Sequence, residues 1–455
     1  MAERQLSEAE ASFVAGRLDE VAEICGDLIA ADPDCHQAFY LLGRTCMSLG
    51  KFDEAREMIE QATRIRSDAA PYHTELGNLL ASSGQFDAAV ASYRTAITLA
   101  PDFVDPRVNL GAALQLLDRN DEALVVYREA TELVPDAAAL QFNLAEAFTK
   151  AGDDAAALDG YRRAVELEPE WADLQRNFGM ALLVEGEIEA AEAACRKAVS
   201  LVPEDADNQV ALARALVASG DSRGALAVCD AYLASHSFHV AVAACRALVL
   251  NETGSGDTTA RLLGLETFVR LEGIAPPVAF GSLAAFNEAL SRETTAQFTP
   301  EYDPARRVVE GGRQSGERFV NPGAAVALLM ERIDEAVREF ASGFDASDSH
   351  PFLARKPRKW RLKGYSTELF PDGHVHANIR PEAWMSGLYI ANSEGAPEVT
   401  LGVPPASWNF AADPISRTLY PEAGEMLLYP SHVYCGVKAG SNEGCLLYAF
   451  QIVRE

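Results

Sequence analysis

The 455-residue sequence lacks the features that mark two common classes of protein. Basic residues are scarce, with 39 Lys and Arg against 67 Asp and Glu, and the formal net charge is −28. Such a chain has few cations to neutralise phosphates, so we expect no nucleic-acid partner. No apolar run is long enough to span a bilayer, and the first residues show no secretory signal, so we expect no membrane partner.

Paired cysteines are also lacking. The chain has 8 cysteines, and none of them form a C-x-x-C pair. This scatter fits a reducing compartment better than a disulfide-stapled secreted protein. We therefore expect a cytoplasmic location.

What the sequence does contain is a period of 34 residues through its N-terminal half. Glycines recur at one position of the period, and prolines at another: Gly16, Gly50, Gly84, Gly152, Gly186 and Gly220; Pro101, Pro135, Pro169 and Pro203. A glycine that ends one helix and a proline that stops the next predict repeated helix pairs. The period and these residues resemble the tetratricopeptide repeat. We expect a repeat array, with about seven repeats in residues 5–240, as a domain spanning 1–250.

Two further positions of the period describe the packing. A small residue after an apolar one, as at Leu76-Gly77, lets the first helix of a pair approach its partner closely. A second position accepts Ile, Tyr and Cys, which indicates a buried site. We therefore interpret Cys25, Cys195 and Cys229 as small hydrophobic residues of the core.

Asparagines 34 residues apart lie on the first helix of three repeats: Asn109, Asn143 and Asn177. In this family the first helices line the concave surface, and an amide can donate and accept hydrogen bonds to a peptide bond. The arrangement resembles the asparagine ladder of O-linked N-acetylglucosamine transferase repeats and implies an extended peptide or protein as partner. The alternative is that these asparagines are solvated or contact neighbouring repeats.

Beyond the repeats the sequence predicts two further regions. Residues 251–345 favour a mainly helical connector. Residues 346–455 contain short apolar runs separated by Pro, Gly, Asp and Asn, which is typical of a sandwich or jelly roll. If 374–380 is a regular strand, alternation places His374, His376, Asn378 and Arg380 on one face. We therefore expect an α+β multidomain protein.

The C-terminal region resembles a known family in two segments, "WMSGLYIA" and "PEAGEMLLYPS". They are similar to the 2-oxoglutarate/iron(II)-dependent oxygenases that are often fused to tetratricopeptide repeats. The resemblance implies a double-stranded β-helix (jelly-roll) barrel, Fe(II) and 2-oxoglutarate. It departs from the family at the expected ligand positions, which hold Asn378, Arg380 and Cys435, and there is no arginine near Gly444.

Two hypotheses follow for this barrel. Either a metal site has moved to His374, His376 and His432, and the chain is a hydroxylase of a protein or peptide bound by the repeats. Or the barrel is catalytically degenerate, needs no cofactor, and acts as a ligand-binding or protein-interaction module. In the second case Arg380, Asn378 and Cys435 line a pocket in which the guanidinium would suit an anion such as a carboxylate.

Overall fold

The computed structural model describes residues 2–117, 119–236, 239–295, 309–315, 319, 322–344, 350–380, 382–393, 395–405, 408, 412–441 and 444–455. The chain separates into two compact units, Met1–Leu167 and Glu168–Glu455. In the described part of the first unit, every element is a helix. The second unit contains further helices of the same kind and a sheet.

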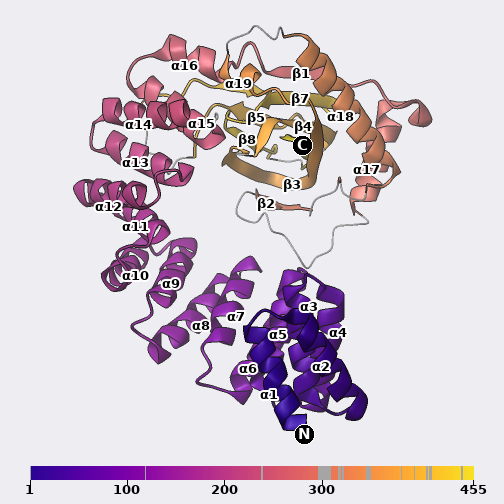
Figure 1. Cartoon of the computed structure of the whole chain (residues 1–455). Coiled ribbons are helices and arrows are strands. Elements are labelled where there is room, and N and C mark those ends of the chain that lie inside the picture. The colour runs from indigo at the N-terminus through magenta and orange to yellow at the C-terminus, as the bar shows by residue number, and fades with distance from the viewer. Residues whose placement is uncertain are drawn as a thin grey trace. The chain divides into compact units, whose positions relative to one another are not determined.

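Antiparallel helix pairs follow one another along the first unit (Figure 1). They are α1 (Ala2–Val14), α2 (Leu18–Ala31), α3 (His36–Ser48), α4 (Phe52–Ile65), α5 (Ala70–Ser82), α6 (Phe86–Leu99), α7 (Asp105–Leu116), α8 (Asn120–Leu133), α9 (Ala138–Ala151) and α10 (Asp154–Leu167). The second unit continues with α11 (Ala172–Val184), α12 (Ile188–Leu201), α13 (Ala206–Ala218), α14 (Ser222–Ser235), α15 (Val240–Glu252) and α16 (Gly256–Leu263). The predicted helical solenoid is confirmed.

The array extends beyond the predicted end near residue 240. The periodic glycines are in the left-handed region, for example Gly220 at φ 85°, and Gly254, 34 residues later, follows with φ 74°. This glycine separates α15 from α16, as its predecessors separate the helices of earlier pairs. The last helix pair therefore crosses the predicted boundary at residue 250, and its second helix, α16, lies within the region predicted as connector.

The small residues act as predicted. A Cβ on Gly77 would lie 2.5 Å from the Tyr93 ring, and one on Gly179 would lie 2.6 Å from the Cys195 sulfur. Each glycine therefore lets the two helices of its pair pack face to face. Cys25, Cys195 and Cys229 are fully buried in this interface, as predicted.

Between the array and the main strands lie β1 (Arg270–Gly273), a 3-10 turn (Val278–Phe280), α17 (Leu283–Thr295), β2 (Val309–Gln314), α18 (Ala324–Ser342) and α19 (Pro351–Ala354). The strands β1 and β2 pair with β7 (Glu425–Pro430) and β3 (Trp360–Asn378), so the predicted connector contributes to the sheet. Its helices α17 and α18 supply Phe286, Leu329 and Ile333 to the core against one face of that sheet.

The remaining strands are β3 (Trp360–Asn378), β4 (Ala383–Ser393), β5 (Glu398–Leu401), β6 (Arg417–Leu419), β7 (Glu425–Pro430), β8 (Cys435–Lys438) and β9 (Cys445–Arg454). The described strands form one nine-stranded sheet with the order β1-β7-β4-β9-β3-β8-β5-β6, and β2 pairs with β3 off this path. All pairs are antiparallel. Within the described residues no pairing joins β1 to β6, so the sheet is a half-barrel.

The last repeat helices pack directly on this half-barrel. Leu250 of α15 and Leu262 of α16 share a buried cluster with Leu427 of β7 and Val437 of β8. A second contact joins Leu248 of α15 to Tyr434. The end of the repeat array and the sheet therefore share one hydrophobic core.

Candidate functional site

A β-bulge near the end of β3 decides which side chains face the inside of the half-barrel. Val375 pairs with Val437 of β8, whereas Asn378 pairs with Cys435. Between these two pairs β3 advances by three residues and β8 by two, so β3 contains one extra residue, which defines a β-bulge. Because strand side chains alternate, the extra residue reverses which face each later side chain occupies.

The bulge separates the histidines from the residues that follow them. Val375, Asn378 and Arg380 line one cavity, and His374 and His376 do not. The prediction that both histidines share a face with Asn378 and Arg380 is therefore wrong. A regular strand would have produced that face, but the strand is not regular at this point.

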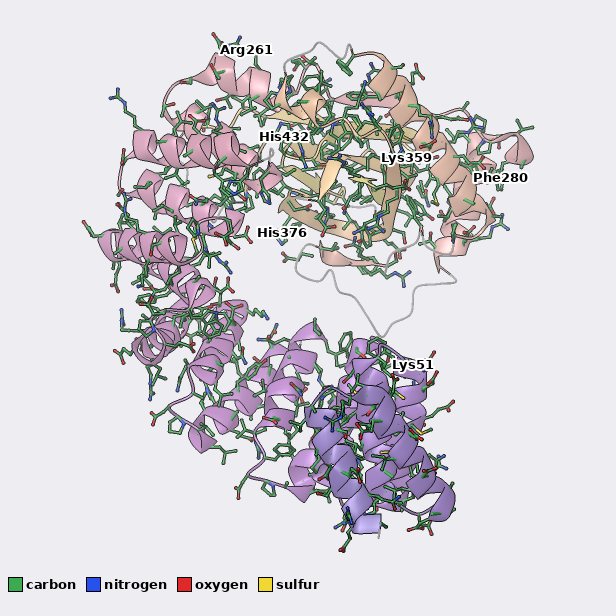
Figure 2. The ribbon with its side chains drawn as sticks, in the orientation of Figure 1. Lys51, Arg261, Phe280, Lys359, His376 and His432 are labelled. Atoms are coloured by element: carbon green, nitrogen blue, oxygen red, sulfur yellow. The ribbon has the colours of Figure 1, made fainter. Side chains whose placement is uncertain are left out.

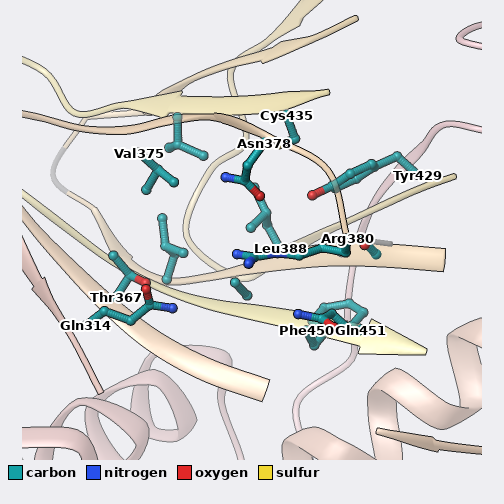
Figure 3. A pocket seen from close by; sticks show the side chains of 15 residues that line it. Gln314, Thr367, Val375, Asn378, Arg380, Leu388, Tyr429, Cys435, Phe450 and Gln451 are labelled. Carbon is teal, nitrogen blue, oxygen red and sulfur yellow. The ribbon is translucent and has the colours of Figure 1, made fainter. Parts of the chain in front are cut away.

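The cavity lies inside the half-barrel, between β3, β4, β7, β8 and β9. Its volume is about 30 Å³. Figure 3 shows the Arg380 side chain reaching into its middle, with the Asn378 amide and the Tyr429 hydroxyl turned toward the same space. Asn378 and Cys435 line it together with Arg380, so the three residues expected at ligand positions do converge.

The polar groups around the cavity are neutral or cationic. Gln314 and Gln451, which are 8% and 9% exposed, both line it with side-chain amides. No aspartate or glutamate is among the described lining residues. The Arg380 guanidinium likewise forms no ion pair with any carboxylate that the structure describes. Such a set of donors suits an anion.

Burial holds the ionisable groups of the cavity in their protonated forms. Removal from water raises the pKa of the Cys435 thiol to about 11, although a hydrogen bond with Tyr429 and the nearby Arg380 act in the opposite direction. Burial also raises the pKa of Tyr429. At neutral pH the cavity therefore holds a thiol and a phenol, and its formal charge comes from Arg380.

Iron does not fit these residues. Arginine has no lone pair to offer a metal, and its positive charge repels a cation at short range. Cys435 offers sulfur, a ligand that suits zinc or copper better than an oxygenase iron. The Asn378 amide nitrogen donates to the carbonyl oxygen of His376. The cavity, of about 30 Å³, is also too small to enclose a whole 2-oxoglutarate molecule.

His432 is in a different place from the other two predicted metal ligands. Its Nε2 donates to the carbonyl oxygen of Leu262 at 2.9 Å, and the ring is fully buried beside Phe352. Burial lowers its pKa to about 4. Figure 2 shows His432 and His376 well separated in the C-terminal domain. The structure therefore does not assemble the expected site of His374, His376 and His432.

In the first unit, one predicted asparagine lies in a groove. Asn109 of α7 lines a hollow of about 400 Å³ with residues of α3 and α5, which are the first helices of the two preceding repeats. Its amide nitrogen donates to the Asn78 side-chain oxygen at 2.8 Å, and the Tyr93 hydroxyl donates to the same oxygen at 2.9 Å. Tyr40, Arg44 and Glu75 complete the polar wall.

Sequence reasoning missed Asn78 because it lies three residues after the position that Asn109 occupies in its own repeat. The other predicted asparagines do not line this groove. Asn143 is half-buried on α9 of the first unit, and Asn177 is half-buried on α11 of the second. The structure thus places one member of the predicted ladder in a groove and adds a new neighbour to it.

Fold and groove together define a helix-pair repeat protein joined to an antiparallel sheet domain. Residues 13–79 and 182–248 match one tetratricopeptide-repeat model, residues 108–173 match a second, and residues 77–118 match a TPR-repeat model. The N-terminal array is therefore a tetratricopeptide-repeat array. A comparison with curated proteins found no match.

Several solved structures are similar to part of the chain. A Pseudomonas aeruginosa PilF structure has 15% identity and a TM-score of 0.42, and covers 46% of this chain and 95% of its own. YrrB, described as a TPR protein with an unusual peptide-binding site, has 21% identity and a TM-score of 0.37, with coverages of 41% and 96%. MamA has 20% identity and a TM-score of 0.34, with coverages of 35% and 94%.

Proposed function

We propose that this chain is a protein-binding module whose repeats hold an extended segment of a partner. The observation that carries the proposal is the groove formed by α3, α5 and α7, where Asn78 and Asn109 stand side by side. Because the Asn109 nitrogen is committed to Asn78, its side-chain oxygen is left to accept from a peptide N–H. Paired amides of this kind read a peptide backbone rather than one side chain.

Charge refines the kind of segment that fits. Arg44 and Glu75 lie in the same groove, 3.9 Å apart between guanidinium and carboxylate. The Arg44 guanidinium also lies over the Phe13 ring at 4.6 Å. The groove thus offers one charge of each sign beside an amide pair, and suits an extended segment of mixed polarity. The overall charge of −28 favours a partner with a basic surface.

Selection from a displayed peptide library on the full chain tests this proposal. Replacing both Asn78 and Asn109 by Ala should weaken binding of the selected peptides by at least tenfold, because the Asn109 contact to the peptide backbone and the Asn78 amide that holds Asn109 in place are both lost. Thr98→Ala, on the exposed face of α6 in the same repeat, is the matched control. Equal binding by the double variant and the control would refute the groove as the binding surface.

For the C-terminal domain we propose a double-stranded β-helix that binds an anion in place of a metal. The strand order supports this fold: the first half of β3 pairs with β9, which is followed by β4, β7 and β1, and its second half pairs with β8, which is followed by β5 and β6. Two antiparallel rows of strands that share one strand fit the two sheets of a jelly roll. Arg380, which has no carboxylate partner in the described chain, supports anion binding rather than hydroxylation.

The size of the cavity specifies which part of a ligand it admits. A volume of about 30 Å³ accommodates a head group, whereas whole-ligand pockets span about 300–1,000 Å³. A carboxylate fits the fork of donors on an arginine. The proposed ligand therefore places one carboxylate against Arg380, with Gln314 and Gln451 as further donors.

Carboxylate titrations test this second proposal. Acetate, succinate and 2-oxoglutarate should each raise the melting temperature of the full chain, and Arg380→Met should abolish the rise. Lys363→Met is the matched control, because Lys363 pairs with Glu382 at 3.0 Å and does not line the cavity. Conversion of 2-oxoglutarate to succinate in the presence of Fe(II) would instead restore the oxygenase hypothesis.

A further inference from the structure

Outside the cavity, three side chains with metal-binding atoms stand together on β2 and β3. Glu310 of β2 is the register partner of His374 of β3. The ligand atoms of Glu310, His374 and His376 all lie within 4.8 Å of one another. No other cluster of at least three such residues is present in the described ranges of the chain.

Strand geometry explains why these three meet. His374 and His376 are two residues apart, so both side chains leave β3 on the same face. Glu310 approaches that face from the neighbouring strand. Val375, between the two histidines, points into the cavity instead. The cluster is therefore on the outer face of the domain, separate from the positions of Asn378, Arg380 and Cys435.

Two of the three spacings between ligand atoms match those of a tetrahedral metal site, and the third is within 4.8 Å. One Glu310 oxygen lies 3.2 Å from Nε2 of His374 and 3.4 Å from Nε2 of His376. Zinc binds nitrogen and oxygen at about 2.0–2.1 Å, and a tetrahedron of that radius has edges of about 3.3 Å. The two histidine rings are nearly perpendicular, at 87°. The contacts are ion-pair distances, and neither is a hydrogen bond in the structure.

We propose that Glu310, His374 and His376 bind a divalent transition-metal ion of the zinc class. Two imidazoles and one carboxylate are ligands that this class accepts. The side chains are 69%, 34% and 52% exposed, so an ion reaches them from solvent. Three protein ligands leave the fourth tetrahedral position to water or to a group of a partner. The proposal is independent of the groove and of the carboxylate cavity.

Binding of Zn²⁺ to the metal-stripped full chain tests this site, with a chromophoric chelator as competitor. The expected result is one equivalent, and Co²⁺ in its place should show the intense visible absorption of a tetrahedral ion. His374→Ala and His376→Ala should each weaken binding by more than tenfold, since losing even an outer-sphere partner costs about 10–100-fold. Glu310→Gln should weaken it as well.

Two further variants make the test specific. His73→Ala, in the repeats, should bind as the unaltered chain does. Lys438 is the register partner of His374 on β8, so its ammonium repels an ion there. Lys438→Gln should therefore tighten binding roughly two- to fivefold at low salt.

Each outcome decides for or against the site. Absence of stoichiometric binding would overturn the proposal. So would equal binding by His374→Ala and the unaltered chain. Melting curves without metal establish that each variant is folded, because these exposed side chains contribute little to the core.

Discussion

Asn378 and Cys435 lie opposite each other as register partners on β3 and β8, and both line the cavity beside Arg380. In the oxygenase family that the sequence resembles, the same positions are expected to carry histidines. The present pair offers an amide that is already hydrogen-bonded and a thiol held in its protonated form by burial. The pair therefore offers this cavity hydrogen-bonding groups.

Replacing Arg380 by Met should stabilise the second unit while removing anion binding. The charge of Arg380 has no carboxylate partner in the described chain, and a side chain of similar length without charge avoids its desolvation. We expect a gain of about 1 kcal/mol in the free energy of unfolding. All four tryptophans (Trp171, Trp360, Trp384 and Trp408) lie in this unit, so their fluorescence during urea unfolding reports it. A loss of stability would show that the guanidinium is needed for the fold.

The second unit should become less stable as the pH is lowered, because His432 is buried in its neutral form. The pKa of His432 is lowered from 6.5 to about 4, since burial disfavours the charged ring, and His350 and Arg355 add repulsion. The unfolded chain therefore takes up a proton first. The stabilisation is complete above about pH 6.5 and is lost as the pH falls toward 4, by about 3 kcal/mol.

Urea titrations at several pH values check this expectation through the tryptophan signal. His432→Gln should remove that part of the pH dependence, since glutamine does not titrate. The same substitution at His73, which lies in the first unit, should leave it unchanged. If the His432→Gln variant kept the full dependence of unfolding free energy on pH, groups other than His432 would be responsible for it.

Gly77→Ala should destabilise the first unit by overpacking. The new methyl group would lie 2.5 Å from the Tyr93 ring, so the two helices must move apart. We expect a cost of about 1–3 kcal/mol, measured by circular dichroism during unfolding. Ala145 occupies the position of Gly77 two repeats later. It faces Gly160 on its partner helix, and because Gly160 has no side chain, the methyl group of Ala145 fits between the two helices. Ala145→Gly should cost less, about 0.5–1 kcal/mol.

Gly254→Ala should destabilise the last helix pair through the backbone alone. Nothing lies within 4 Å of an added methyl group, but φ is 74°, which an L-residue adopts at a cost of about 1–2 kcal/mol. Two residues later, Gly256 also has open space and no positive φ. Gly256→Ala should be neutral or stabilising, so only Gly254→Ala is expected to lower the free energy of unfolding in urea.

The repeat array was predictable because its signal is local and recurs at fixed spacing. Helix pairs, glycine turns and buried cysteines followed from the period. The helix α18 also lies in the region predicted as mainly helical. The end of the array was misjudged, although Gly254 continues the period from Gly220. The helix α16 has only 8 residues, so its apolar pattern was too short to stand out in the sequence.

The sites were less predictable because they depend on pairing between distant strands. Glu310 meets His374 only after β2 has paired with β3, and nothing near Glu310 in the sequence indicates that register. Asn78 was missed for a related reason, since it meets Asn109 across two repeats from a different position of the period. The candidate residues were identified by type, but their grouping is a property of the fold.

The bulge in β3 has an evolutionary consequence. Insertion or deletion of a single codon between Val375 and Asn378 exchanges the inner and outer faces for every residue on one side of the change. A family can therefore move imidazoles from its interior to its surface, or back again, in one mutational event and without altering any side chain. Relatives of this chain that differ by one residue at this point would then differ in which face carries their metal-binding groups.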